Sequence, residues 1–155
     1  MKKVFLIAAL ASWLISLISC SSGNPMQTVM AQTGYTNASL NGTYSLSLVG
    51  PFTTASVSFF SGIGTIQLNG TGGVTGGTLN IYFSATTTPC VYGAAGTYSI
   101  QSTALGTATL NLTSSTKGCA ASDTWQLALA AADGGAAVQF VRTDGSVVSG
   151  SAIKQ

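Results

Sequence analysis

Apolar residues recur at every second position through most of the chain after Leu40, and this alternation limits the fold more than any other feature. In the segment TYSLSLV, Tyr44, Leu46 and Leu48 share one face of an extended strand, and Thr and Ser residues occupy the other. Such alternation predicts an antiparallel sheet with one buried face, because successive side chains of a strand point to opposite sides. The other predicted inward sets are Val57 and Phe59, Ile66 and Leu68, Leu79, Ile81 and Phe83, Tyr98 and Ile100, Ala108, Leu110 and Leu112, Trp125, Leu127 and Leu129, and Val138 and Phe140.

Short glycine-containing turn signals, such as GTGG, ALG, DGG and DG, separate the alternating runs. Short connections between consecutive strands predict an all-β, antiparallel, up-and-down eight-stranded β-barrel, in which closure removes the exposed edges. An open β-sandwich is the alternative. Gly62 and Gly64 would supply the bend that the long second strand needs to curl around a barrel. The eight predicted strands cover residues 43–49, 55–69, 74–83, 95–102, 105–113, 123–131, 136–143 and 147–153.

The N-terminus has the pattern of an export signal. Lys2 and Lys3 precede an apolar run from Val4 to Ile18, which is the basic n-region and apolar h-region of a secretory signal peptide. A membrane-spanning helix needs about 20 apolar residues. The run is shorter than that, and no charged residue follows it before Lys117. We therefore expect cleavage rather than a permanent span.

Leu17-Ile18-Ser19-Cys20 resembles the bacterial lipobox, whose cysteine becomes the lipid-modified N-terminus. The resemblance implies a diacylglyceryl group on the Cys20 thiol and an acyl chain such as palmitate on its amine. Together these would anchor the protein stably to a membrane. The alternative is ordinary secretion with cleavage after Val29-Met30-Ala31, a small-residue site that lies well beyond the apolar run. The expected location is the cell envelope, at the outer membrane or its periplasmic or extracellular face.

This interpretation divides the chain into a lipoprotein signal peptide at residues 1–19, a flexible tether at residues 20–39 and a β-barrel domain at residues 40–155. The tether lacks a sustained period and contains several small polar residues. A flexible segment of this length spans roughly 25 Å on average, which suffices to hold a domain clear of lipid headgroups.

The two remaining cysteines, Cys90 and Cys119, form an even pair in an exported chain and predict a disulfide bond. In an up-and-down barrel their two loops would emerge at the same end. Two separate buried thiols are the alternative. A metal site is not expected, because the chain has no histidine and its cysteines lack C-x-x-C spacing.

Charge excludes several functions. Beyond the signal, Lys117, Arg142 and Lys154 balance Asp123, Asp133 and Asp144, so the net charge is zero and no basic cluster is available for nucleic acid. The lack of histidine and glutamate removes the usual proton-transfer groups, so we do not expect an enzyme. Asp123 would pair with Lys117 or cap a loop, and Asp133 and Asp144 precede glycine in predicted turns. No cofactor is implied.

The large inward side chains are candidates to line a barrel interior. They are Tyr44, Phe59, Tyr98, Trp125 and Phe140. Arg142 shares the face of Phe140 and would be costly inside unless paired, which places it at the barrel mouth or outside. Two functions fit these residues. In the first, the domain binds a small apolar ligand, a glycan or a protein partner. In the second, it is a structural or adhesive envelope protein with a filled barrel.

Four segments resemble a secreted or lipid-anchored β-rich module of Acidobacteria-type bacteria. They are LNGTYSLSLVG, TIQLNGTGGVTGGTLN, GTYSIQSTALGTATLNL and QFVRTDGSVVSGSAIKQ, and the resemblance covers nearly everything after the tether. Their motifs are turn and strand patterns, so the resemblance implies a fold and no catalytic residue. The G-T-Y opening and eight-stranded plan are also similar to avidins and lipocalins, but only in general architecture, because the polar and tryptophan set of a biotin site is absent from this sequence.

Overall fold

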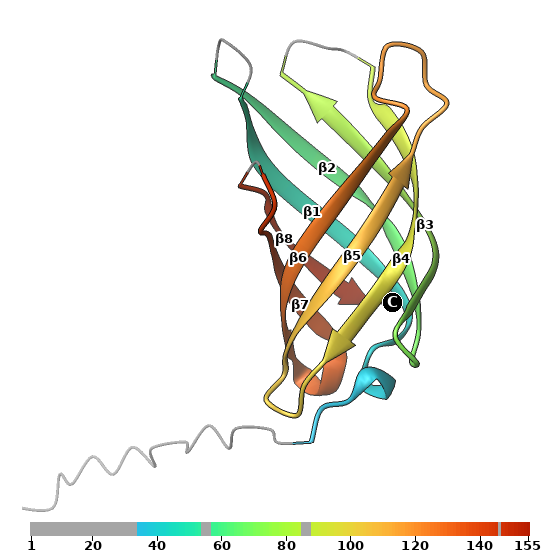
Figure 1. Cartoon of the computed structure of the whole chain (residues 1–155), viewed down its shortest axis with the longest axis vertical. Coiled ribbons are helices and arrows are strands. Elements are labelled where there is room, and N and C mark those ends of the chain that lie inside the picture. Colours follow the sequence, from blue (N-terminus) through green and yellow to red (C-terminus); the bar gives the residue numbers. More distant parts are fainter. Residues whose placement is uncertain (1–33, 54–56, 85–87, 146) are drawn as a thin grey trace, which may run out of the picture. The chain divides into compact units, whose positions relative to one another are not determined.

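Eight antiparallel strands close into a barrel in the computed structural model (Figure 1). The structure describes residues 34–53, 57–84, 88–145 and 147–155, which belong to the second of the chain's two compact units, Ala31–Gln155. The predicted signal, Cys20 and the alternative cleavage site at residues 29–31 lie outside the described residues. The elements are η1 (Asn37–Ser39), β1 (Asn41–Thr53), β2 (Val57–Asn69), β3 (Gly73–Phe83), β4 (Cys90–Ile100), β5 (Leu105–Thr113), β6 (Ser122–Ala132), η2 (Asp133–Gly135), β7 (Ala137–Arg142) and β8 (Ser149–Lys154).

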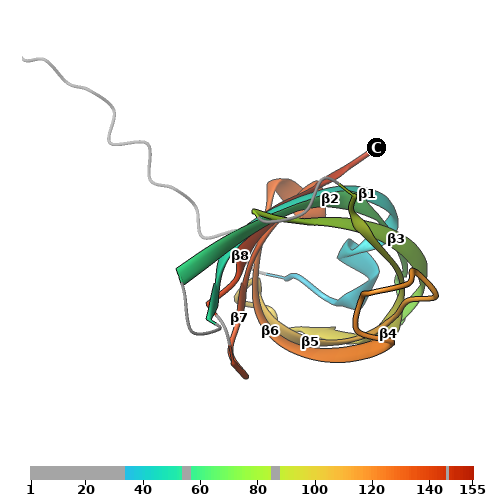
Figure 2. The same ribbon diagram turned by 90° about the horizontal axis from the view of Figure 1, so that it is seen from above.

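The strands pair in chain order, and the barrel closes where β8 pairs with β1 (Figure 2). Tyr44 lies opposite Lys154 and Val49 opposite Ser149 in this closing pair. The prediction of an up-and-down eight-stranded barrel is confirmed, and the sandwich alternative is wrong. Closure pairs most of the sheet on both sides, which limits the exposed edge that would otherwise be a template for aggregation. Because β7 and β8 are short, residues 50–53 of β1 pair only with β2 and residues 122–126 of β6 pair only with β5.

Inward residues were predicted for seven of the eight strands, and in six of these the alternating residues form the core as predicted. Inward positions carry aliphatic and aromatic side chains, while the outward positions are largely Ser, Thr, Asn and Gln. Tyr44, Leu48, Leu79 and Leu112 are at most 2% exposed. Burial of a side chain of this size stabilises the fold by about 1.5–3 kcal/mol, so this single core dominates the stability.

The second strand departs from the prediction. Phe59 was expected inside, but its side chain is 65% exposed, and Phe60 is the buried neighbour at 6%. The pairing with β1 decides this, because residues directly opposite each other share a face. Phe60 lies opposite the buried Gly50, and Phe59 lies opposite Pro51. The side chain of Val57 lies outside the described residues.

Two glycines conceal the true register of β2. Gly62 and Gly64 lie on the same face as Phe60, so no large apolar residue marks the inward face between Phe60 and Ile66. The strand stays continuous through both glycines. A Cβ on Gly64 would lie 2.0 Å from the carbonyl oxygen of Thr78 in β3, so glycine permits a strand approach that no other residue allows.

Residues 34–39 were assigned to the flexible tether, and this boundary is wrong. Tyr35 is 6% exposed, and η1 lies across one open end of the barrel (Figures 1 and 2). We call Tyr35–Leu40 the plug and this opening the plug end. The opposite opening, which carries the β5–β6 loop, is called the rim. Among the described residues, no helix has the length and hydropathy needed to cross a membrane.

Candidate functional site

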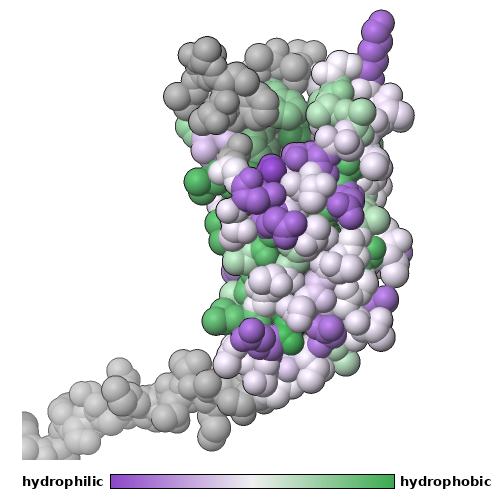
Figure 3. Space-filling view, viewed as in Figure 1, coloured by the Kyte–Doolittle hydropathy of each residue, from purple (hydrophilic) through white to green (hydrophobic). Residues whose placement is uncertain are grey.

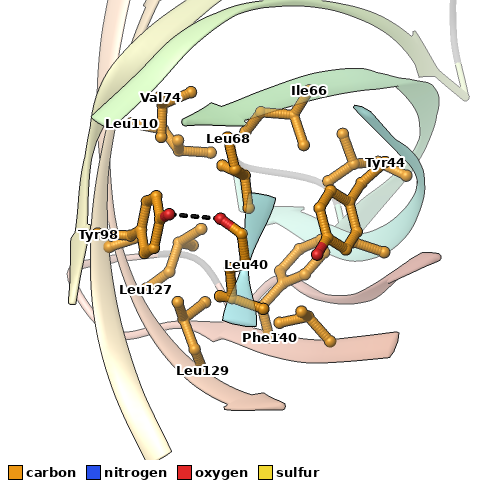
Figure 4. A pocket seen from close by; sticks show the side chains of 14 residues that line it. Leu40, Tyr44, Ile66, Leu68, Val74, Tyr98, Leu110, Leu127, Leu129 and Phe140 are labelled. Atoms are coloured by element: carbon orange, nitrogen blue, oxygen red, sulfur yellow. Dashed lines mark hydrogen bonds between the residues drawn. The ribbon is translucent and has the colours of Figure 1, made fainter. Parts of the chain in front are cut away.

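The barrel interior holds an apolar cavity of about 50 Å³ above the plug (Figure 4). Its walls expose apolar atoms alone. The lining residues are Leu40, Tyr44, Leu46, Ile66, Leu68, Val74, Tyr98, Ala108, Leu110, Leu127, Leu129, Val138, Phe140 and Ala152. Pockets for small-molecule ligands usually measure roughly 300–1,000 Å³, and one water occupies about 30 Å³ of liquid. This cavity is therefore large enough for a very small apolar molecule and too small for a lipid or a cofactor.

Leu40 closes the cavity on the plug side. Its side chain is 1% exposed and projects between Tyr98 and Tyr44 in Figure 4. The sequence placed Leu40 at the start of the barrel domain but did not identify it as a residue that seals the interior. The signal that could have identified it is its position immediately before the first alternating run, with Tyr35 five residues earlier.

Two inward tyrosines bind the backbone that covers the plug end. The Tyr98 hydroxyl lies 2.5 Å from the Leu40 carbonyl oxygen and 3.0 Å from that of Asn37, and its one proton serves one acceptor at a time. The Tyr44 hydroxyl donates to the carbonyl oxygen of Gly135 in η2 over 2.6 Å. The buried carbonyls of Leu40 and Gly135 each gain a donor in this way, and a buried carbonyl without a donor costs about 1–3 kcal/mol.

The side chain of Asn37 adds a further contact at this end, because its Oδ1 accepts a hydrogen bond from the Ile100 amide over 2.9 Å. The Gly134 amide donates to the Tyr35 hydroxyl over 3.2 Å. In these hydrogen bonds, neutral groups join the plug to β4 and η2. These contacts explain why a segment without a strand or helix pattern adopts one conformation.

Burial keeps Tyr44 and Tyr98, the two tyrosines that bond to backbone at the plug end, protonated. Desolvation raises the pKa of Tyr44, and the neighbouring Tyr98 adds to the rise. Desolvation also raises the pKa of Tyr98, and the backbone amides of Gly70 and Gly72 offset part of that change. The neutral phenol is the form that donates a proton to a carbonyl, so the raised pKa values preserve both bonds at any neutral pH.

At the rim, Arg142 is the centre of a charged cluster. Its Nε donates to Asp144 Oδ1 over 2.8 Å, and its Nη1 donates to Asp123 Oδ2 over 3.3 Å. The Nη2 donates to the Thr124 carbonyl oxygen over 3.3 Å. The guanidinium carbon lies 5.2 Å from the centre of the Trp125 ring, which is a cation–π distance. Arg142 therefore lies at the barrel mouth, one of the two predicted places, with its charge compensated by the chain itself.

The carboxylates of this cluster are engaged as well. Asp123 Oδ2 also accepts a hydrogen bond from Trp125 Nε1 over 2.6 Å, so the predicted pairing of Asp123 with Lys117 is wrong. Desolvation acts to raise the pKa of Asp144, but the hydrogen bond from Arg142, backbone hydrogen bonding at Gln126 and the charge of Arg142 outweigh it and hold that pKa below its usual range. The pKa of the nearby Tyr92 is raised by desolvation and by the charge of Asp123.

The disulfide bond lies at the same opening. Cys90, the first residue of β4, is bonded to Cys119 in the β5–β6 loop, with 5.7 Å between their Cα atoms. Ser114 supports this junction by donating its hydroxyl to the Val91 carbonyl oxygen over 2.7 Å. The predicted pairing of the two cysteines is confirmed, as is their placement at one end of the barrel.

The structure brings the predicted interior residues together only in part. Tyr44, Tyr98 and Phe140 line the cavity, whereas Trp125 lies at the rim beneath Arg142 and Phe59 faces outward. Within the described part of the chain, no group of three or more His, Cys, Asp or Glu side chains is arranged to hold a metal ion.

Comparisons with known proteins add no identity. No family model, curated protein or solved structure matches the chain.

Proposed function

We propose that the chain is a non-catalytic lipoprotein of the bacterial cell envelope, in which a filled β-barrel acts as a rigid scaffold for surface contacts. The observation that carries this proposal is the interior cavity, whose volume of about 50 Å³ is several-fold below that of ordinary ligand pockets. Around this cavity, core side chains from β1 to β8 form the walls and Leu40 closes the plug side. A barrel filled in this way offers its outer wall and loops to partners rather than its interior.

The state of the polar groups supports a non-catalytic role. Asp123 and Asp144 are bound to Arg142, and Asp133 forms the η2 turn. A general acid or base needs a free group within hydrogen-bond reach of a substrate. The rim carboxylates instead act as structural partners of one guanidinium.

The lipobox at residues 17–20 supports the envelope location. In a bacterium that processes lipoproteins, the full chain should incorporate labelled palmitate and remain in the membrane fraction after a high-salt wash. Cys20→Ala should abolish labelling and release the protein, whereas Cys90→Ala with Cys119→Ala should leave labelling unchanged. Membrane retention of the Cys20→Ala protein would contradict lipid anchoring.

Binding of a very small apolar molecule is a second candidate function, and the apolar lining of the cavity supports it. Native mass spectrometry of the purified protein distinguishes the two. A filled scaffold gives the mass of the processed chain alone, whereas a bound apolar molecule adds a discrete mass that disappears on unfolding.

A further inference from the structure

A cluster of exposed apolar side chains lies on the outer wall of β1, β2 and β3. Val49 is 57% exposed, Phe59 65%, Ile63 57% and Tyr82 40%. On the sheet, Ser61 lies opposite Val49 on one side and Tyr82 on the other, and Phe59 and Ile63 are its nearest neighbours on the same face of β2. These four side chains therefore surround one serine, and we call them the outer patch.

The outer patch extends along both neighbouring strands. Pro51 of β1 lies opposite Phe59. Val91 of β4 is 41% exposed and lies opposite Asn80, two residues from Tyr82 on the same face of β3. At these exposed fractions the patch offers on the order of 400–500 Å² of apolar surface, since a buried aromatic side chain covers 150–250 Å². That area is comparable with the largest apolar patch on a typical monomer, which is often functional.

The strands that carry the outer patch have no charged side chain. No Lys, Arg, Asp or Glu occurs between Lys3 and Lys117, so β1 to β5 carry none. The hydroxyl and amide side chains around the patch, among them Ser47, Ser61 and Asn80, can bond to water or lipid esters without a desolvated charge. Figure 3 shows the barrel face that includes β5 and β6, where pale and purple residues prevail; Figure 2 places β1 to β3 on the opposite side.

Area alone does not separate a second copy from a lipid surface, because a stable protein–protein interface buries about 800 Å² on each partner and only a little over half of that is apolar. The proposed lipid anchor favours the lipid surface. A lipid surface needs no such minimum when the protein is already anchored, because a tether raises the effective concentration to the millimolar range. Neutral aromatic and aliphatic side chains are also the groups that settle at the membrane–water interface.

The chain between the proposed anchor and the barrel is long enough for this contact. Residues 21–33 separate Cys20 from Gly34 at the plug end. A chain of thirteen residues reaches about 45 Å at full extension and about 20 Å on average. The patch lies roughly 25 Å along the barrel axis from the plug end, given the rise and tilt of barrel strands. The acyl chains can therefore enter the bilayer beside the patch.

We infer that the outer patch is a lipid-contact surface, by which the barrel lies with its β1–β3 wall against the bilayer that holds its anchor. This inference rests on the proposed lipid anchor. A barrel in this position has a defined orientation on the bilayer, unlike a domain held clear of the lipid headgroups by its tether. Its contact with lipid should depend on the apolar area of the patch and should be insensitive to salt and to anionic lipid.

The test uses the full lipidated chain with one added thiol, because Cys20 would be acylated and Cys90 and Cys119 are bonded to each other. Ser61→Cys labels the centre of the patch, and Asn111→Cys labels the exposed rim half of β5 as the matched control. Each protein, labelled with bimane, is reconstituted in phosphatidylcholine vesicles with and without brominated acyl chains. We expect quenching at position 61 to exceed that at position 111 by about threefold or more, since bromine quenches only nearby fluorophores.

A second pair of variants tests the side chains themselves. Phe59→Ser with Ile63→Ser, made in the Ser61→Cys protein, should reduce the excess quenching to the level of the control. Leu105→Ser with Ile153→Ser removes two side chains that are 57% and 60% exposed outside the patch, and it should leave the quenching unchanged. All four positions are exposed, so an unchanged thermal midpoint will show that both proteins are folded.

The outcomes separate the inference from the proposed function. Co-flotation with vesicles but equal quenching at positions 61 and 111 overturns the lipid-contact surface and leaves the anchor intact. Failure to float overturns the anchor and the surface with it. Oxidative cross-linking between two unlabelled Ser61→Cys copies, without excess quenching, would assign the patch to a second copy and also overturn the inference.

Discussion

The two ends of the barrel are held together by different chemistry. At the plug end, the neutral hydroxyls of Tyr98 and Tyr44 hold backbone carbonyls of the plug and η2. At the rim, Arg142 holds two aspartates and the Cys90–Cys119 bond ties the β5–β6 loop to β4. The plug end therefore depends on buried neutral hydrogen bonds, which salt and moderate pH leave unchanged. The rim depends on a covalent bond and on partly exposed charges, which reductant and pH can alter.

This contrast shows where the barrel is open to regulation by its surroundings and where it is not. Buried hydrogen bonds are costly to break, because the freed carbonyl finds no water. Charges at a half-exposed mouth retain some solvation, so their loss costs less.

The largest loss of stability is expected for Phe60, a core residue near the rim. Phe60 is 6% exposed and its ring centre lies 6.0 Å from that of Phe83, so Phe60→Ala should lower the free energy of unfolding by about 3–5 kcal/mol through loss of contacts and a new cavity. Phe59→Ala is the matched control, because Phe59 is 65% exposed on the adjacent position, and it should change that free energy by less than about 0.5 kcal/mol. Denaturant titration measures both. Similar losses at the two positions would mean that both faces of β2 are buried.

The disulfide bond is expected to have the next largest effect, and to act on the rim alone. It joins residues that are 29 apart in the chain, so its removal should cost about 2–4 kcal/mol by releasing the unfolded chain from a closed loop. The double variant Cys90→Ala, Cys119→Ala should show this loss in the denaturation midpoint. Amide hydrogen exchange should rise in the β5–β6 loop and stay low in η1. Two free thiols in the unreduced, denatured protein would show that no bond forms.

Loss of the Tyr98 or the Tyr44 hydroxyl should lower the free energy of unfolding by less than loss of the disulfide bond. Tyr98→Phe and Tyr44→Phe leave the Leu40 and Gly135 carbonyls without their donors, which should cost about 1–3 kcal/mol each. Tyr82→Phe on the outer wall, where the side chain is 40% exposed, should be nearly neutral. Hydrogen exchange at the Ile100 amide, which is bonded to Asn37, reports release of the plug directly. Unchanged exchange there would mean that the hydroxyls do not hold the plug.

Changes of pH should have the smallest effect in the neutral range and should act in opposite directions at the two ends. The chain has no histidine, so stability should be nearly constant between about pH 5 and 9. Desolvation raises the pKa of Tyr44 and Tyr98, so their stabilising contribution is complete below about pH 10 and is lost as pH rises further.

At the rim, stability depends on pH in the opposite direction. Desolvation acts to raise the pKa of Asp144, but the hydrogen bond from Arg142, backbone hydrogen bonding at Gln126 and the charge of Arg142 lower it overall. Its contribution is therefore complete above about pH 4 and is lost as pH falls through the lowered value. Asp144→Asn should reduce the slope of stability with pH on the acid side and leave the alkaline side unchanged. Denaturation midpoints across pH for both proteins test this, and a changed alkaline limb would contradict the assignment of that limb to the tyrosines.

Most of the fold could be predicted because a strand reports its buried face through local alternation. The segments from Tyr44 to Leu48 and from Ala108 to Leu112 each place apolar residues two apart, and the structure buries those residues. The even pair of cysteines likewise predicted a bond that the barrel topology allows. The prediction failed on β2, where glycines at the inward positions 62 and 64 remove the apolar residues that would show the register.

The candidate site was less predictable, because its contacts join elements that are distant in the chain. Nothing near Arg142 in the sequence indicates that it pairs with Asp123, which lies 19 residues away. The sequence alone suggested Lys117 as the partner of Asp123. The plug shows the same limit: Tyr98 bonds to Leu40 across 58 residues of chain. Such pairs form because closure of the barrel brings distant groups within hydrogen-bond distance.

The all-β character, the strand count, the identity of most inward residues and the lack of charge from β1 to β5 could be read from the sequence, because they follow from composition, turn signals and a period of two. The burial of Phe60 rather than Phe59, the closing of one end by Tyr35–Leu40 and the cavity of about 50 Å³ beside Leu40 became clear only from the folded barrel. The physical reason is that a strand's face is a local property of the backbone. Register, closure and free volume instead depend on which side chains meet when strands from the whole chain surround one core.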